Sequence, residues 1–183
     1  MRFRAFISAD ITPNEKLVSL LRQLAMSRAD LKVVRPELLH VTLKFLGDTE
    51  EGMVNQIEEL IKDCTKGVPP FTVRLRGMGA FPSMSNIRVV WVGMEDAQPL
   101  GVIAKRLDDS LKALGFERDT KGFKPHLTLA RTRSPRNIAN LQDIIKESAA
   151  SDFGDYPVRS IHLKKSVLNP QGPTYSVVRE IML

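Results

Sequence analysis

The stretch that decides this fold occurs twice, as His40-Val41-Thr42-Leu43 and again as His126-Leu127-Thr128-Leu129. Each copy reads histidine, apolar residue, threonine, apolar residue. Successive side chains of a β-strand point to opposite faces, so each copy would bury its two aliphatic side chains. The imidazole and the hydroxyl would project together from the other face, about 7 Å apart along the strand. Two of the three histidines in the chain lie in this phrase, so we expect both strands to carry function.

The two phrases are 86 residues apart, and the same offset relates much of the remaining chain. It carries Val89 onto Phe3 and Val158 onto Thr72. Each half reads strand, helix, short strand, histidine strand, helix and strand, and one more strand completes the last hairpin. We therefore predict one domain, 1–183, in which repeats of about 1–86 and 87–183 form two similar lobes. A pseudo-two-fold axis between them would make the histidine strands equivalent walls of one cleft.

Local patterns give approximate bounds for the individual elements. Amphipathic periodicity and turn residues predict helices over 13–27, 49–66, 98–114 and 135–149. Thr12 and Ser134 are the expected caps of the first and last helix, each followed by proline. Alternating or β-branched runs predict strands at 3–9, 31–34, 38–46, 71–81, 87–94, 116–118, 123–131, 158–168 and 175–182. Gly47 is expected to end the first histidine strand, and turns are expected at 82–86 and 169–173.

The composition is that of a globular protein with a basic excess. The chain has 183 residues, of which 43% are hydrophobic and 26% charged, and its formal net charge is +6. That charge favours polyanionic partners such as RNA, DNA or nucleotides, without distinguishing a mononucleotide from a long RNA. The single Cys64 excludes an internal disulfide and lacks zinc-ligand neighbours, so a reducing cytoplasm is the simplest location. We expect no membrane segment, since no apolar run is long enough to span a bilayer.

Two facing His-Thr pairs have the chemistry needed for phosphoryl transfer. Imidazole titrates near neutrality, so one histidine can accept a proton from the nucleophile while the other protonates the leaving oxygen. Thr42 and Thr128 would each direct a hydroxyl at a non-bridging phosphate oxygen. No cluster of Asp, Glu or Cys surrounds either phrase. We therefore expect neither a metal nor another cofactor, and from the residues alone either histidine can be the acid or the base.

These features resemble the two-histidine phosphoesterase superfamily, and most of all its RNA 2′,3′-cyclic phosphodiesterase branch, also described as 2′-5′ RNA ligase. The resemblance extends over essentially the whole chain, and all four motif positions match. It rests on segments that look like family motifs: Arg2–Phe6, Leu39–Gly47, Gly79–Pro82, Arg88–Gly93, Lys124–Arg131 and Gly172–Tyr175.

The resemblance implies a bilobal α+β fold in which two antiparallel sheets line a central cleft, with the helices outside. It also implies hydrolysis of a terminal RNA 2′,3′-cyclic phosphate to a 2′-phosphate. His40 would be the general acid that protonates the leaving 3′ oxygen, and His126 the general base that activates water. Run in reverse, the same groups would join RNA ends through a 2′-5′ linkage without ATP. The expected partners are RNAs with 2′,3′-cyclic phosphate ends, tRNA fragments among them, and the expected state is a monomer.

Two alternatives stay open beside this interpretation. The same catalytic groups would serve a phosphodiesterase for a small cyclic phosphate, such as ADP-ribose cyclic phosphate. A long basic groove leaving the cleft would indicate RNA, whereas a closed pocket would indicate a small ligand. The scaffold would also suit a non-catalytic module that binds RNA or nucleotides. The intact histidines and threonines argue against that module, because binding alone has no need of two proton carriers.

Three further residues are candidates for substrate binding. Arg131 follows the second histidine strand and would meet the phosphate or a neighbouring nucleotide, although a structural ion pair is an equal alternative. Lys44 shares the face of Thr42 by strict alternation and would reach the rim of the cleft. Tyr175 is a candidate for stacking on a base.

The remaining aromatic and basic side chains have simpler interpretations. Phe81 is another stacking candidate, but a place in the core is favoured for it, as it is for Phe45 and Trp91. His162 has no threonine two residues later, so a structural or surface role is favoured. A basic cluster around the second phrase forms either a solvated rim or a track for an RNA backbone: Lys121, Lys124, Arg131 and Arg133.

Overall fold

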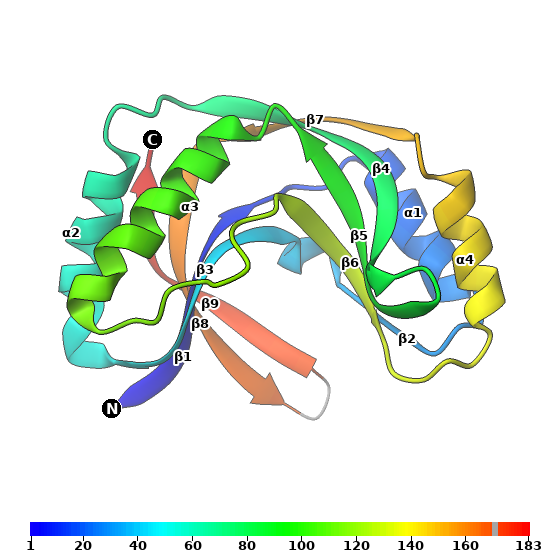
Figure 1. Ribbon diagram of the computed structural model, residues 1–183, viewed down its shortest axis with the longest axis horizontal. Coiled ribbons are helices and arrows are strands. Elements are labelled where there is room, and N and C mark those ends of the chain that lie inside the picture. Colours follow the sequence, from blue (N-terminus) through cyan, green and yellow to red (C-terminus); the bar gives the residue numbers. More distant parts are fainter. Residues whose placement is uncertain (170–171) are drawn as a thin grey trace.

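The computed structural model describes residues 1–169 and 172–183 (Figure 1). The strands have these bounds: β1 (Arg2–Asp10), β2 (Leu31–Val33), β3 (His40–Glu50), β4 (Phe71–Ser83), β5 (Asn86–Glu95), β6 (His126–Thr132), β7 (Asp152–Val158), β8 (Ser160–Asn169) and β9 (Gly172–Met182). The α-helices are α1 (Glu15–Met26), α2 (Val54–Thr65), α3 (Gln98–Leu111) and α4 (Ile138–Glu147). Short 3-10 turns occupy Pro36–Leu38, Glu51–Met53 and Lys112–Leu114.

The strands form two antiparallel sheets, which confirms the expected α+β class. The first sheet has the order β3-β1-β8-β9, and the second has the order β2-β6-β5-β4-β7. Each histidine strand pairs with the strand that begins its own half: β3 with β1, and β6 with β5. The phrase that opens each histidine strand is therefore fixed against a central strand of its sheet.

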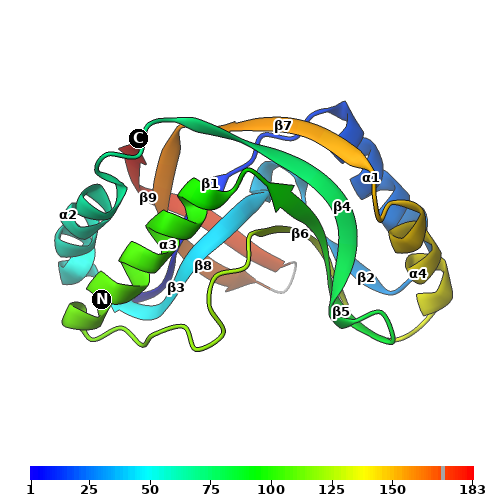
Figure 2. The ribbon, with the colours of Figure 1, turned by 45° about the horizontal axis from the view of Figure 1, so that its top comes forward.

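The helices cover the outer faces of the sheets at opposite ends of the molecule. Figures 1 and 2 show α2 and α3 beside the first sheet, and α1 and α4 beside the second. Each helix buries one apolar stripe at helical spacing, as Ile57 and Ile61 do on α2 and Leu107 and Leu111 do on α3. These stripes meet the aliphatic faces of the histidine strands, where Val41 and Leu127 are buried. The opposite face of each sheet is thereby left to the polar side chains.

Each sheet contains strands from both halves of the sequence. The first sheet combines β1 and β3 with the β8–β9 hairpin from the far end of the chain. The second sheet combines β5, β6 and β7 with β2 and β4 from the first half. Each sheet also receives one helix from each half, since α2 and α3 lie together, as do α1 and α4 (Figure 1). A single domain built from an internal repeat remains our interpretation of this arrangement.

An irregularity at the same place in both histidine strands changes the faces of the following residues. Ile7 pairs with Lys44 and Ser8 with Thr42, so Leu43 is an extra residue in β3. Val90 pairs with Ala130 and Trp91 with Thr128, so Leu129 is the extra residue in β6. Such a β-bulge reverses the alternation of the side chains that follow it, up to any further bulge. The two bulges are 86 residues apart, like the histidines that precede them.

Gly47 does not end the first histidine strand, because β3 continues to Glu50. A second bulge leaves Leu46 unpaired between the Ala5–Gly47 and Phe6–Phe45 pairs. Gly47 has a φ of 69°, which a residue without a side chain adopts at little cost. β3 therefore continues to pair with β1 beyond the bulge, as far as Glu50.

Helix caps also differ from the predicted ones. Asn14, not Thr12, caps α1, and its Oδ1 accepts a hydrogen bond from the Leu17 amide at 3.0 Å. The Asn14 amide group also donates to the Phe153 carbonyl at 2.7 Å, a tertiary contact that sequence proximity does not reveal. The Ser134 hydroxyl donates to Asp30 instead of capping α4, which begins later, at Ile138.

Two strand predictions were wrong. β7 was missed because Gly154 and Pro157 interrupt its pattern, although Phe153, Tyr156 and Val158 are buried. Residues 116–118, predicted as a strand, form irregular chain instead. The β4–β5 turn is confirmed, but the predicted turn at 169–173 includes Pro170 and Gln171, which lie outside the described residues.

Candidate active site

Each histidine of the repeated phrase is the first residue of its strand. His40 begins β3 and His126 begins β6, and the two strands approach each other in the middle of the molecule (Figure 1). Val41 and Leu127 are buried, whereas both histidines and both threonines are only partly buried. The predicted division between an aliphatic face and a polar face is therefore confirmed at the phrase itself.

The two imidazoles are held by equivalent hydrogen bonds. Nδ1 of His40 lies 2.7 Å from the Leu38 carbonyl oxygen, and Nδ1 of His126 lies 2.7 Å from the Lys124 carbonyl oxygen. A carbonyl only accepts, so Nδ1 carries the proton and donates in both cases. The Nε2 atoms are then free to exchange a proton with a ligand, because the tautomer is set by the bond at the other nitrogen.

Aromatic rings surround His40. Its ring centroid lies 5.1 Å from that of Phe6 and 5.3 Å from that of Tyr175, which meets it edge-on at 88°. Burial lowers the pKa of His40 below its usual value, and the nearby charges of Lys164 and Arg131 lower it further. The Leu38 carbonyl and Asp10 act in the opposite direction. His40 is therefore predominantly neutral at neutral pH when no ligand is present.

His126 has a different neighbour. Phe81, on β4, meets the His126 ring edge-on, with centroids 5.1 Å apart and an interplanar angle of 88°. Phe81 also lies 5.2 Å from Trp91, centroid to centroid. The preference for a core role at Phe81 was thus incomplete, because its half-buried ring contacts the second histidine directly. Trp91 is only partly buried as well.

Of the three candidate binding residues, Tyr175 contacts the first histidine and Arg131 acts on it through its charge. Arg131 is close enough for its charge to act on both His40 and the Tyr175 phenol. Burial raises the pKa of Tyr175, and Arg131 opposes that shift. The second histidine strand thus carries a cation whose charge acts on the histidine of the first strand. The alternative of an ion pair for Arg131 finds no partner in the described residues.

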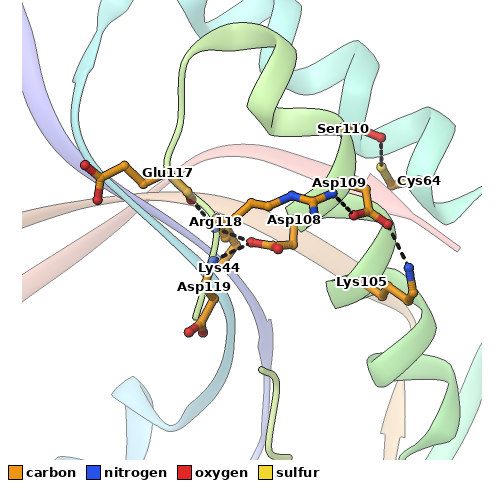
Figure 3. A network of polar contacts seen from close by, with 9 residues as sticks. All are labelled: Lys44, Cys64, Lys105, Asp108, Asp109, Ser110, Glu117, Arg118 and Asp119. Atoms are coloured by element: carbon orange, nitrogen blue, oxygen red, sulfur yellow. Dashed lines mark hydrogen bonds and ion pairs between the residues drawn. The ribbon is translucent and has the colours of Figure 1, made fainter. Parts of the chain in front are cut away.

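Lys44 does not lie at the rim of a cleft, so that prediction is wrong. The bulge at Leu43 turns Lys44 toward the helices, where its side chain is only 5% exposed and its Nζ lies 2.5 Å from Asp108 (Figure 3). The same reversal exposes Phe45 to solvent. Phe45 was expected in the core, but it is 71% exposed. Phe45 pairs across the strands with Phe6, so the two rings share the face of His40.

A polar cluster beside His40 was not predicted from the sequence. Asp10 pairs with His40 across β1 and β3, and its carboxylate accepts from Lys164 Nζ at 2.5 Å. His162 is buried between Asp10 and Glu180, at 3.5 Å and 3.2 Å, which agrees with a structural role. Strict alternation over β1 already places Asp10, Ser8 and Phe6 on one face. Only the pairing of β1 with β8 shows that His162 and Lys164 lie beside that face.

No group of three or more metal-ligating side chains occurs in 1–169 and 172–183. No helix among these residues is long and apolar enough to cross a membrane. One surface depression lies between α1 and α4 and another beside the end of β3, and neither is lined by His40 or His126. The central cleft therefore remains a prediction.

Comparison with known proteins identifies the family of this chain. The model of the "LigT like Phosphoesterase" family matches residues 10–91 and again residues 92–175. The chain belongs to the LigT-like phosphoesterase family. Each of the two family matches contains one histidine phrase, at the positions where the structure places equivalent Nδ1 hydrogen bonds.

Curated LigT-like relatives match almost the whole chain. An RNA 2′,3′-cyclic phosphodiesterase from Archaeoglobus fulgidus is 38% identical over 178 residues, covering 96% of this chain and 98% of the relative. Another of that name from Methanothermobacter thermautotrophicus is 36% identical, with 96% of each chain covered. A solved structure from Thermus thermophilus has a TM-score of 0.79 and 29% identity, over 98% of this chain and 97% of that one. The expected superfamily membership is confirmed.

Proposed function

We propose that this LigT-like protein is an RNA 2′,3′-cyclic phosphodiesterase that hydrolyses a terminal cyclic phosphate to a 2′-phosphate. The observation that carries the proposal is the pair of imidazoles held by equivalent Nδ1 bonds, each leaving Nε2 free for proton transfer. The names of the curated relatives support the same substrate. The net charge of +6 suits an anionic substrate.

In the proposed mechanism, the histidines work in opposite directions across one phosphate. His126 takes a proton from water through Nε2 as the water oxygen attacks phosphorus. The bond from phosphorus to the 3′ oxygen breaks, and His40 gives that oxygen its proton. The product carries a 2′-phosphate and a 3′-hydroxyl, and a proton returned from His126 to His40 through solvent completes the cycle.

The lowered pKa of His40 places a condition on the acid role. A general acid must hold its proton when the substrate is bound, whereas burial favours neutral His40 in the free protein. An anionic phosphate beside the ring favours the imidazolium, because an opposite charge nearby stabilises the charged form. Substrate binding would therefore load His40 with the proton that it later donates.

The threonines and the neighbours of His40 have supporting roles in the proposal. The partly buried Thr42 and Thr128 would each direct a hydroxyl at a non-bridging phosphate oxygen. Arg131 would bind the phosphate or a neighbouring nucleotide as a charge-assisted donor. Tyr175 would contact the nucleoside beside His40.

Three finer features belong to the same proposal. The chemistry uses no metal and no other cofactor, and it takes place in the cytoplasm, in a monomer that acts on RNA ends such as those of tRNA fragments. The free, buried Cys64 fits a reducing compartment. In reverse, an RNA 5′-hydroxyl would replace water as the nucleophile and form a 2′-5′ linkage without ATP.

The test is incubation of the protein with an RNA oligonucleotide ending in a 2′,3′-cyclic phosphate, in EDTA, followed by mapping of the product. A terminal 2′-phosphate is the expected result. Parallel reactions contain ADP-ribose cyclic phosphate, or a second RNA with a 5′-hydroxyl and no ATP. Turnover of the small compound alone would replace RNA with a small substrate, and turnover of neither would contradict the proposed activity. A strict metal requirement would contradict the two-histidine mechanism.

A further inference from the structure

The segment that delivers the second histidine to the site has no regular structure. Residues 115–125 connect the turn after α3 with β6 and contain neither helix nor strand. His126 follows directly, and the carbonyl oxygen that holds its Nδ1 belongs to Lys124, within the same segment. The placement of the His126 ring therefore depends on how this irregular chain is held.

Lys44, from the first histidine strand, holds the beginning of that segment. Its Nζ donates to the Glu117 carbonyl oxygen at 2.5 Å and to Asp108 Oδ1 at 2.5 Å (Figure 3). The same Asp108 oxygen accepts from the Asp119 amide at 2.8 Å. One ion pair thus binds two backbone positions of the segment, on either side of Arg118.

Both residues of the Lys44–Asp108 ion pair belong to regular elements of the fold. Lys44 is fixed in β3, two residues after Thr42, and Asp108 is on α3 between the buried Leu107 and Leu111. Burial acts to raise the pKa of Asp108, but the bonds from Lys44 and from the Asp119 amide together hold it below its usual value. Asp108 is therefore ionised and retains both donors. The Arg118–Asp109 pair on the same segment is largely exposed, and exposed pairs contribute little.

We propose that Lys44, acting through Asp108, is a positioning residue for His126. The bulge at Leu43 turns Lys44, the residue that follows the first phrase, away from the substrate and toward the segment that leads to the second phrase. With Glu117 and Asp119 fixed, the Lys124 carbonyl meets Nδ1 of His126, and Nε2 faces the reacting phosphate. Neither Lys44 nor Asp108 touches the substrate. The kinetic consequence rests on the proposed function, but the placement of the ring does not.

The test compares Lys44→Met with a matched control, Lys105→Met, which removes an exposed pair with Asp109 on the same helix. With a cyclic-phosphate oligonucleotide, we expect kcat to fall about tenfold or more in Lys44→Met, since small misplacement of a catalytic group is costly. KM should stay close to the wild-type value, because the lost interaction concerns the reaction rather than binding. Lys105→Met should match the wild type in both.

A second readout needs no turnover. The chain has three histidines, so the ¹⁵N chemical shifts of His126 can be assigned and followed directly. Wild type and Lys105→Met should show the Nδ1–H tautomer that the Lys124 carbonyl selects. Lys44→Met should show a mixture of tautomers. Even if the wild-type protein did not hydrolyse the cyclic-phosphate oligonucleotide, the tautomer of His126 would still show whether Lys44 positions the ring.

The double variant Lys44→Met/Asp108→Leu separates positioning from charge balance. It removes the lone carboxylate, so it should recover the thermal stability that Lys44→Met loses. It does not restore the bonds to Glu117 and Asp119, so kcat and the tautomer mixture should remain altered. Recovery of kcat together with stability would overturn the proposal, and so would a wild-type tautomer and kcat in Lys44→Met.

Discussion

The two histidine strands begin alike and then diverge. His40 and His126 have the same Nδ1 bond to the carbonyl two residues earlier, and both strands bulge three residues after the histidine. Beyond the bulge, Lys44 in β3 corresponds to the buried Ala130 in β6, and the exposed Phe45 corresponds to Arg131. In the proposed mechanism, the shared part binds the phosphate from both halves. The divergent part allows the two halves to do different work.

The surroundings of the two rings diverge as well. His40 lies against Phe6 and Tyr175, with Lys164, Asp10 and Arg131 near enough for their charges to act on it. His126 lies against Phe81 at the end of an irregular segment. The two imidazoles thus have the same hydrogen bond at Nδ1 but different neighbours. The asymmetry lies in these neighbours and not in the phrase.

The largest expected effect comes from removing either imidazole. His40→Ala and His126→Ala should each lower kcat on a cyclic-phosphate oligonucleotide by about 10²–10⁴-fold, the usual contribution of a positioned acid or base. Rates are measured beside circular dichroism and thermal unfolding, to show that the fold persists. A folded variant with a near-wild-type rate would remove that histidine from the mechanism.

A substrate with a better leaving group should make the two losses unequal. On bis(4-nitrophenyl) phosphate the leaving phenolate needs no proton, so His40→Ala should lose far less activity than on the cyclic phosphate. His126→Ala should lose about as much on both, because water still needs a base. The opposite pattern would exchange the roles of acid and base between the two histidines.

The reversal of faces after the bulge can be tested through stability. Lys44→Ala leaves the partly buried Asp108 without its cation and should lower the free energy of unfolding by about 2 kcal/mol. Phe45→Ala removes an exposed ring and should change it by about 0.5 kcal/mol or less. Urea unfolding measures both. Strict alternation along β3 requires the reverse order, so that outcome would argue against the bulge.

The smallest expected effect is a shift in pH dependence. A general acid works only when protonated, so kcat/KM should decline as pH rises through the lowered pKa of His40, below its usual 6.5. Lys164 helps to lower that pKa, so Lys164→Met should move the decline to higher pH. Lys62→Met, on the outer face of α2, is the control and should leave the profile unchanged. A rising limb that moves instead would identify His40 as the base.

The sequence by itself determined the parts that depend on local periodicity. Alternation within the phrase placed His40 and Thr42 on one face and Val41 on the other, because a strand has a period of two. The stripe of leucines and isoleucine predicted α3 from its correct first residue, Gln98. Repetition of the phrase at an offset of 86 residues was visible without any coordinates.

Only the tertiary structure decided the features that depend on contacts between strands. A bulge depends on the partner strand, so periodicity could not show that Lys44 turns inward and Phe45 outward. Pairing between strands decided that Asp10 and Tyr175 lie beside His40, and packing between the sheets decided that the charge of Arg131 acts on it, since these residues are far apart in the sequence. In the proposed mechanism, the phrase supplies the groups that react. Packing around it, through burial and nearby charge, decides how the two copies differ.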